Sequence, residues 1–506
     1  MTGPLRAGAA SLSIAPPLGL PMQGFIRRYR HAEGYGAPLE VSALVLESHD
    51  TRVVLCGVDT AAIQRPAADA LRARVAASVG AAPGGVILNW SHTHCAPPGD
   101  RAFGPLGLGG GDPSDEMLEA LGIYIDRMYE RVVEAALLAS SRLEPAGIAW
   151  GLGTADLAVN RRERTPEGQV ILGWRPDGLI DRSVTALQAR RPDGSAIATV
   201  VSYGCHSVTV GPDVLDYSAD YPGPMRRAIR QWTGGEAVFL QGAGGNVLPR
   251  VAFAGHDEAE RFGQRLALEA LHALAERTAG RRVWERHPDG SATPFSVYRF
   301  RDDLDEAPAL AAVEEEVRFP LMPLPTENEI ARMRAQFAAA VEEAERSGGP
   351  AQRNVWRYHL VWAQRTEAQI RSGIAPGHAS GPINAVRIGP GAIVTGPGEV
   401  FTEIGLAVKE RSPAAPTLYA GYANGEVSYF PTAASYPEGG YEPVHGHRPH
   451  GLPASVSPVC ERILIERAVR NLERVFPERD AFAGGSWAPS GRQPSLAPEP
   501  PPDPPP

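Results

Sequence analysis

The sequence is poor in cysteine and has no long apolar segment. Its four cysteines are scattered through 506 residues and none forms a Cys-x-x-Cys pair, which excludes a disulfide framework. No apolar run approaches the length of a membrane span, and residues 1–24 lack the charged and apolar regions of a signal peptide. We therefore expect a cytoplasmic protein without stable membrane association.

Runs of basic residues are also missing. The formal net charge is −9, which argues against a nucleic-acid partner. Hydrophobic residues make up 43% and charged residues 21% of the chain, as is usual for a soluble globular protein that can bury a large core. We expect a small-molecule substrate, and assembly into a homo-oligomer stays open.

Strand-like and helix-like segments alternate along the first half of the chain. Residues 41–47 and 52–59 are expected to pair as strands, and 66–77 to form a helix before a buried strand that ends at His92. Ser114 is a plausible N-cap for a long helix to about residue 138. Further strands are expected at 147–150, 197–202, 237–241, 385–388 and 392–395, and helices at 225–231, 258–277 and 457–475. This alternation predicts an α/β fold with a mixed sheet flanked by helices.

Residues 305–372 interrupt the alternation. The capping box Thr326-Glu327-Asn328-Glu329 opens a helix to about Arg346, and a second helix follows over 354–371. We interpret them as a helical-hairpin insertion that either covers a site or forms a surface or oligomer contact. The rest of 1–480 is expected to be one domain, and the Pro-rich segment 484–506 a disordered tail.

The segment Ser91-His92-Thr93-His94-Cys95-Ala96-Pro97-Pro98 carries the clearest chemical signal. Alternate residues of a strand point to the same face, so His92 and His94 would present two imidazoles together. Two neutral imidazoles at a strand end suit a divalent metal such as zinc. Two partly buried histidines bonded to the backbone are the ordinary alternative.

Two later segments offer more possible ligands. His206 ends another apolar strand, and carboxyl ends of strands form the functional rim of α/β sheets. Glu399 follows Thr395-Gly396-Pro397-Gly398 and is expected in the first turn of a helix through Val408. It is either an acid favoured at a helix N-terminus or a metal ligand. Asp59, also at a strand end, is either a turn residue or a carboxylate that orients a ligand histidine.

Together these segments resemble the neutral/alkaline, non-lysosomal ceramidase family in its N-terminal catalytic domain. The resemblance spans roughly residues 5–475 and is carried by the order of the segments. They are Arg6-Ala7-Gly8-Ala9-Ala10, Met22-Gln23-Gly24-Phe25, the strand ending in Asp59, His92-Thr93-His94-Cys95-Ala96-Pro97, His206, Pro397-Gly398-Glu399 and the loops with Tyr429 and Tyr441.

The resemblance implies a zinc site and a catalytic set. The ligands would be His92, His206, Glu399 and Tyr429, with His94 beside the metal as a proton shuttle. The residues around the substrate carbonyl would be Arg161 and Tyr441, with Gly24 as a backbone donor. The implied activity is hydrolysis of an amide, or of an ester or lactone, by metal-bound water.

The chain departs from the family pattern at Leu248. Family members carry a serine at the position in Gly245-Asn246-Val247-Leu248-Pro249 where this chain has leucine, which has no oxygen. The long family members also have an immunoglobulin-like C-terminal domain and are exported, neither of which is expected here. A soluble substrate is therefore expected in place of ceramide. A metal-dependent isomerase or lyase acting on a polar substrate, and a non-catalytic binding protein, are the alternatives.

Overall fold

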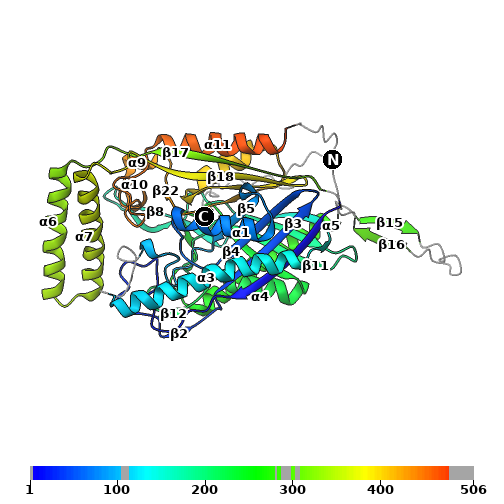
Figure 1. Ribbon diagram of the computed structural model, residues 1–506, viewed down its shortest axis with the longest axis horizontal. Helices are drawn as coiled ribbons and strands as arrows, with labels where there is room; N and C mark the ends of the chain where they lie inside the picture. The colour runs from blue at the N-terminus through cyan, green and yellow to red at the C-terminus, as the bar shows by residue number, and fades with distance from the viewer. Residues whose placement is uncertain (1–3, 104–112, 280–281, 287–297, 303–307, 478–506) are drawn as a thin grey trace, which may run out of the picture.

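The strands form several sheets around a shared apolar centre. The computed structural model describes residues 4–103, 113–279, 282–286, 298–302 and 308–477, so the predicted tail over 484–506 lies outside the described residues. Within them the expected mixed α/β fold is present, although its strands build three main sheets and several short ladders instead of one sheet (Figure 1).

The first sheet has the order β5-β4-β3-β1-β6. These strands are β1 (Arg6–Ser13), β3 (Glu40–Ser48), β4 (Thr51–Val58), β5 (Val86–Trp90) and β6 (Glu144–Pro145), and only β4 and β5 pair in parallel. Helices α1 (Arg65–Val79) and α3 (Asp115–Ser141) cover its outer face. Leu44 and Leu46 enter the central core while Ala43 and Val45 pack under the helices, as strand alternation requires. The expected N-cap is confirmed, because the Ser114 side chain accepts a hydrogen bond from the Met117 amide.

Two further sheets complete the central core. One contains β7 (Gly147–Thr154), β10 (Ser183–Arg190), β11 (Ala196–Tyr203) and β13 (Glu236–Gln241), covered by α4 (Pro222–Thr233) and α5 (His256–Ala279). The other contains β17 (Leu310–Pro320), β18 (His378–Ile388), β19 (Gly391–Thr395) and β21 (Thr417–Ala420), covered by α8 (Thr402–Arg411) and α11 (Val459–Val475). Leu55, Val200 and Ile393, one from each sheet, belong to the same buried cluster.

The helical hairpin consists of α6 (Glu327–Arg346) and α7 (Pro350–Arg371), which lie side by side at one end of the molecule (Figure 1). The Thr326–Glu329 capping box is formed as expected. The predicted start of the insertion at 305 is too early, since 310–320 form β17, an edge strand of the third sheet paired along its whole length with β18. That pairing is between distant segments, so the local sequence pattern does not show it.

Short ladders carry the residues of greatest chemical interest. β8 (Ala158–Arg164) pairs with β9 (Val170–Arg175) and β14 (Val247–Pro249), and β20 (Gly398–Val400) pairs in parallel with β22 (Ser428–Phe430). The remaining elements of the described segments are β2 (Gly34–Tyr35), β12 (Asp216–Tyr217), β15 (Arg282–Arg286), β16 (Tyr298–Asp302), α9 (Ser435–Glu438), α10 (Tyr441–Val444) and two 3₁₀ turns at 83–85 and 101–103. No helix in the described ranges combines the length and hydropathy needed to span a bilayer.

The secondary structure predicted for Glu399 was wrong. Glu399 lies in strand β20, and helix α8 begins only at Thr402, with Glu403 as the acid of its first turn. The backbone at Glu399 stays extended because it pairs with β22. A tertiary pairing therefore overrides the helix-start signal of Gly-Pro-Gly-Glu.

Candidate metal centre and active site

Three histidines meet where strands β5 and β11 end. The Nε2 atoms of His92 and His94 are 3.1 Å apart, and His92, His94 and His206 offer ligand atoms that all lie within 4.8 Å of one another. Strand alternation does not bring the first two together as predicted. β5 ends at Trp90, and His92 has a left-handed backbone (φ 57°), so a turn folds His94 back toward His92.

Backbone carbonyls hold the rings of His92 and His206. The Nδ1 atoms lie 2.8 Å from Ala61 O and 2.8 Å from Gly244 O, respectively. A carbonyl oxygen only accepts, so each Nδ1 carries the hydrogen and each Nε2 presents a lone pair to a metal. His92 Nε2 therefore accepts the hydrogen bond that His94 Nε2 donates.

Asp59 does not take the orienting role considered for it. Both of its carboxylate oxygens bind Arg226, at 2.5 and 3.1 Å, and one of them also accepts from the Glu40 amide. Asp59 and Arg226 are buried, and they form an ion pair between the residue that follows β4 and helix α4, with Glu40 also paired to Arg226. The carbonyls of Ala61 and Gly244 orient the rings of His92 and His206, which is the function considered for the Asp59 carboxylate.

Glu399 and Tyr429 enter the same region from the ladder of β20 and β22. Glu399 Oε2 lies 3.2 Å from His206 Nε2 and 3.4 Å from His92 Nε2. This oxygen is buried and accepts no hydrogen bond. The Tyr429 hydroxyl accepts a hydrogen bond of 3.2 Å from Arg161 Nη2. The four predicted ligands thus come from four separate strands or strand ends.

Arg161 connects this group to a buried carboxylate. Its Nη1 donates to His206 Nε2 at 2.9 Å, and its Nε donates to Glu442 at 2.8 Å. Burial acts to lower the pKa of Arg161, but the charges of Tyr429, Glu442 and Glu399 raise it well above the usual value, so the guanidinium stays protonated. A cation bound at His206 would compete with Arg161 for the Nε2 lone pair. Glu442 was not foreseen from the sequence.

A small cavity of about 70 Å³ opens beside these side chains. The predicted residues that line it are Gly24, His92, His94, Glu399, Tyr429 and Tyr441. Gly24 has φ 107°, and a Cβ atom there would lie 2.3 Å from the His94 ring, so the close approach requires glycine. Tyr441 stacks edge to face with Tyr429 at 5.7 Å.

Among the lining residues that the sequence reasoning missed are Tyr358 and His450. Tyr358 lies on α7, so the hairpin contributes directly to the wall of the cavity. Trp362 and Asn354 fasten this helix by hydrogen bonds to Leu452 O and Arg28 O. A signal for His450 existed, since it belongs to the dense histidine group His445-Gly446-His447-Arg448-Pro449-His450.

The electrostatics favour neutral imidazoles. Burial lowers the pKa of His92 to about 4 and the pKa values of His94 and His206 well below their usual range. Neutral imidazole nitrogens and a carboxylate oxygen are the donors that Zn²⁺ prefers. The unpaired Glu399 oxygen and the two presented Nε2 atoms therefore fit a divalent cation.

Leu248 lies outside the cavity lining. It sits in β14 opposite Val159, and its side chain is partly buried. The loop before it packs against the backbone of Glu399, where a Cβ on Gly245 would lie 2.5 Å from the Glu399 carbonyl. This close packing explains why residue 245 is glycine. The Leu248 side chain offers no group for nucleophilic attack.

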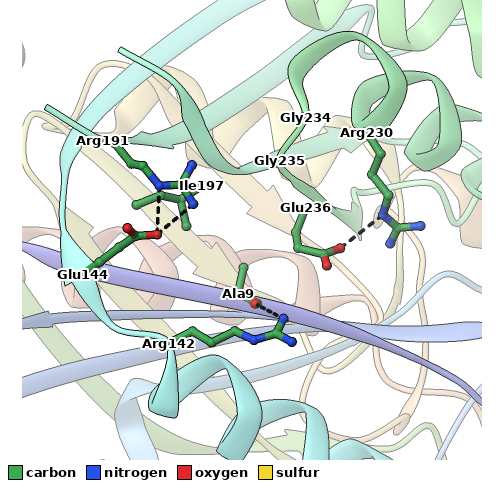
Figure 2. A pocket seen from close by; sticks show the side chains of 9 residues that line it. All are labelled: Ala9, Arg142, Glu144, Arg191, Ile197, Arg230, Gly234, Gly235 and Glu236. Atoms are coloured by element: carbon green, nitrogen blue, oxygen red, sulfur yellow. Dashed lines mark hydrogen bonds and ion pairs between the residues drawn. The ribbon is translucent and has the colours of Figure 1, made fainter. Parts of the chain in front are cut away.

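A larger hollow of about 300 Å³ is lined by residues of β1, β6, β11, β13 and α4, together with neighbouring turns (Figure 2). Its arginines are already paired: Arg191 with Glu144, Arg230 with Glu236, and Arg142 with the carbonyl of Ala9. Histidine and cysteine are absent from its lining residues. Because the charges that line this hollow are paired, it is a weaker candidate for an active site than the histidine cavity.

Solved structures of ceramidases share this architecture. A crystal structure described as neutral ceramidase from Pseudomonas aeruginosa superposes with a TM-score of 0.61 at 17% identity, covering 94% of this chain and 75% of that one. The chain has the ceramidase fold. A structure described as a ceramidase complexed with C2 gives a TM-score of 0.62 at 16% identity, covering 94% and 76%. No protein-family model and no curated protein matches the sequence.

Proposed function

We propose that this chain is a zinc-dependent hydrolase that cleaves a small amide, with esters and lactones as related substrates. The observation that supports it most strongly is the convergence of His92, His206 and Glu399, with Glu399 Oε2 within 3.4 Å of both Nε2 atoms. Tyr429 is the fourth proposed ligand. The ceramidase fold supports hydrolysis as the reaction class.

The metal and the side chains would have different catalytic roles. Bound Zn²⁺ would supply a water ligand of lowered pKa and polarise the substrate carbonyl. His94 lines the cavity, and its Nε2 lies 3.1 Å from His92 Nε2, on the side of the proposed metal; with the His92 lone pair on a metal, this His94 nitrogen would be the one that takes up a proton. Because burial disfavours the imidazolium, His94 would pass that proton on to the leaving group.

Arg161 and Tyr441 are the proposed stabilisers of developing negative charge. Arg161 keeps its positive charge and points two of its nitrogens toward Tyr429 and His206. Tyr441 lines the cavity, with its ring against Tyr429. Donors held rigidly in a buried site lose little energy to reorganisation during reaction, which makes them effective.

The substrate is expected to be small and polar compared with ceramide. The cavity holds about 70 Å³, well below the several hundred Å³ of sites that enclose larger ligands. Tyr358 of the hairpin narrows it from one side. Leu248 offers no hydroxyl, so the proposed reaction proceeds without a serine nucleophile.

Metal content and a substrate panel test the proposal. The purified protein is expected to contain tightly bound zinc and to hydrolyse at least one of a set of short acyl amides, esters and lactones. The His92→Ala variant should lose both the zinc and the turnover, whereas His272→Gln on the exposed side of α5 should lose neither. Bound zinc without turnover of any member would favour a binding protein, and turnover unchanged in His92→Ala would refute the proposed site.

A further inference from the structure

A second group of buried donors lies on the other side of Glu399. Glu399, Glu426 and His450 offer ligand atoms that all lie within 4.8 Å of one another. His450 Nε2 is 3.8 Å from Glu399 Oε1, whereas the histidines of the first centre face Oε2. The two oxygens of one carboxylate therefore point toward two different sets of donors.

The donor atoms of His450 and Glu426 are buried and make no hydrogen bond. The side chain of His450 is 3% exposed, and Glu426 is 3% exposed as a residue. Both ring nitrogens of His450 and both carboxylate oxygens of Glu426 make no hydrogen bond. A buried polar atom without a hydrogen bond is destabilising, so four such atoms in one place indicate a ligand that satisfies them.

We propose that Glu399, Glu426 and His450 bind a second divalent cation, with Glu399 bridging it to the metal of the first centre. The inference rests on the proposed function, because it extends that metal centre to two ions. Two carboxylates and an imidazole suit Zn²⁺ or Mn²⁺. Paired metals about 3.5–4 Å apart are a known arrangement in hydrolases, where they hold the attacking and leaving oxygens.

The position of the second ion relative to the cavity follows from the lining residues. His450 and Glu399 line the cavity, and Glu426 does not. Glu426 is anchored by its backbone, because its amide donates to Ile63 O, two residues before α1. The ion is therefore held from the inner side by Glu426 and reaches the substrate side through His450 and Glu399.

Metal stoichiometry tests the inference. Full-length protein loaded with Zn²⁺ alone and freed of excess metal should hold two ions per chain. The isosteric Glu426→Gln and the variant His450→Gln should each hold one. Matched controls, Glu403→Gln with its carboxylate on Asn246 and His272→Gln on exposed α5, should still hold two.

Anomalous diffraction at the zinc edge locates the ions without any variant. Two peaks about 3.5–4 Å apart, one beside His450, are expected in the wild-type protein. One peak, or two ions retained in both Glu426→Gln and His450→Gln, would overturn the inference. A single peak would mean that a protonated Glu426 satisfies these atoms without a cation, and two ions retained in both variants would mean that the second ion binds elsewhere.

The outcome separates the two proposals. A single zinc lost together with turnover in His92→Ala leaves the proposed hydrolase intact and removes only the second ion. No zinc at all in the wild-type protein removes both.

Discussion

Glu399 and Tyr429 are direct partners in the parallel pair of β20 and β22. Residues opposite each other in neighbouring strands present their side chains on the same face of the ladder. A carboxylate and a phenol from distant parts of the chain therefore reach the same cavity, which both of them line. The register of a two-stranded ladder thus decides part of the donor set.

Glu399→Gln is expected to weaken zinc binding by more than about 100-fold, because loss of a ligand should exceed the 10–100-fold cost of losing an outer contact. The amide keeps the shape of the side chain but removes the charge between His92 and His206. Equilibrium dialysis against buffered Zn²⁺ measures the change. Glu403→Gln, on the neighbouring helix α8, should bind zinc as the wild-type protein does. Equal affinities in all three proteins would contradict the assignment of Glu399.

Arg161→Lys should lower kcat by about 100–1,000-fold with a smaller effect on KM, because it removes fixed donors from the developing oxyanion. Arg162 is a close control: it binds the same Glu442 at 2.8 Å but makes no contact with His206 or Tyr429 in the described structure. Arg162→Lys should lower stability with little change in kcat. Steady-state kinetics with thermal unfolding of both variants distinguishes these effects, and equal losses of kcat would assign Arg161 a structural role.

Tyr358→Phe tests the contribution of helix α7 to specificity. The Tyr358 hydroxyl is buried and has no hydrogen-bond partner, and Tyr358 is one of the residues that line the cavity. Its removal should lower kcat/KM by about 10-fold for substrates with a polar group near it, as expected for one lost hydrogen bond. Substrates without that group should be unaffected, and thermal stability should not fall. A uniform change across the panel would argue against a contact between Tyr358 and substrate.

Acid should destabilise the packing of the hairpin through His359. Burial, helped by the charges of Arg448 and His445, lowers the pKa of His359 to about 3. The unfolded chain binds this proton near pH 6.5, so stability is present above pH 6.5 and is lost as pH falls from there toward 3. The slope for this residue is of order 1 kcal/mol per pH unit.

Denaturant unfolding at pH 7 and pH 5 measures that slope. The variant His359→Gln should lose less stability between the two values than the wild-type protein does. His272→Gln, which changes an exposed histidine, should lose as much as the wild type. An unchanged pH dependence in His359→Gln would show that His359 does not contribute to the loss of stability at low pH.

Local sequence signals predicted the elements well where the signal and the structure are both local. The strands around 48–51, the Ser114 cap and the Thr326–Glu329 capping box all depend on contacts between near neighbours. The same signals failed at Glu399 and at 310–320, where pairing with β22 and β18 sets the conformation. The motif order indicated His92, His206 and Glu399 as residues of one site, but it could not supply their distances.

The sequence by itself determined which segments alternate their apolar faces, where helices start and which side chains can bind a metal, because these properties depend on residue type and close spacing. Only the tertiary structure decided that strand ends, the β20–β22 ladder and helix α7 meet at one cavity. It alone placed His450 and Tyr358 in the wall of that cavity, brought Glu426 close to Glu399 and His450, and paired Asp59 with Arg226. Such contacts join residues far apart in the chain, and they depend on how whole sheets pack on a shared core.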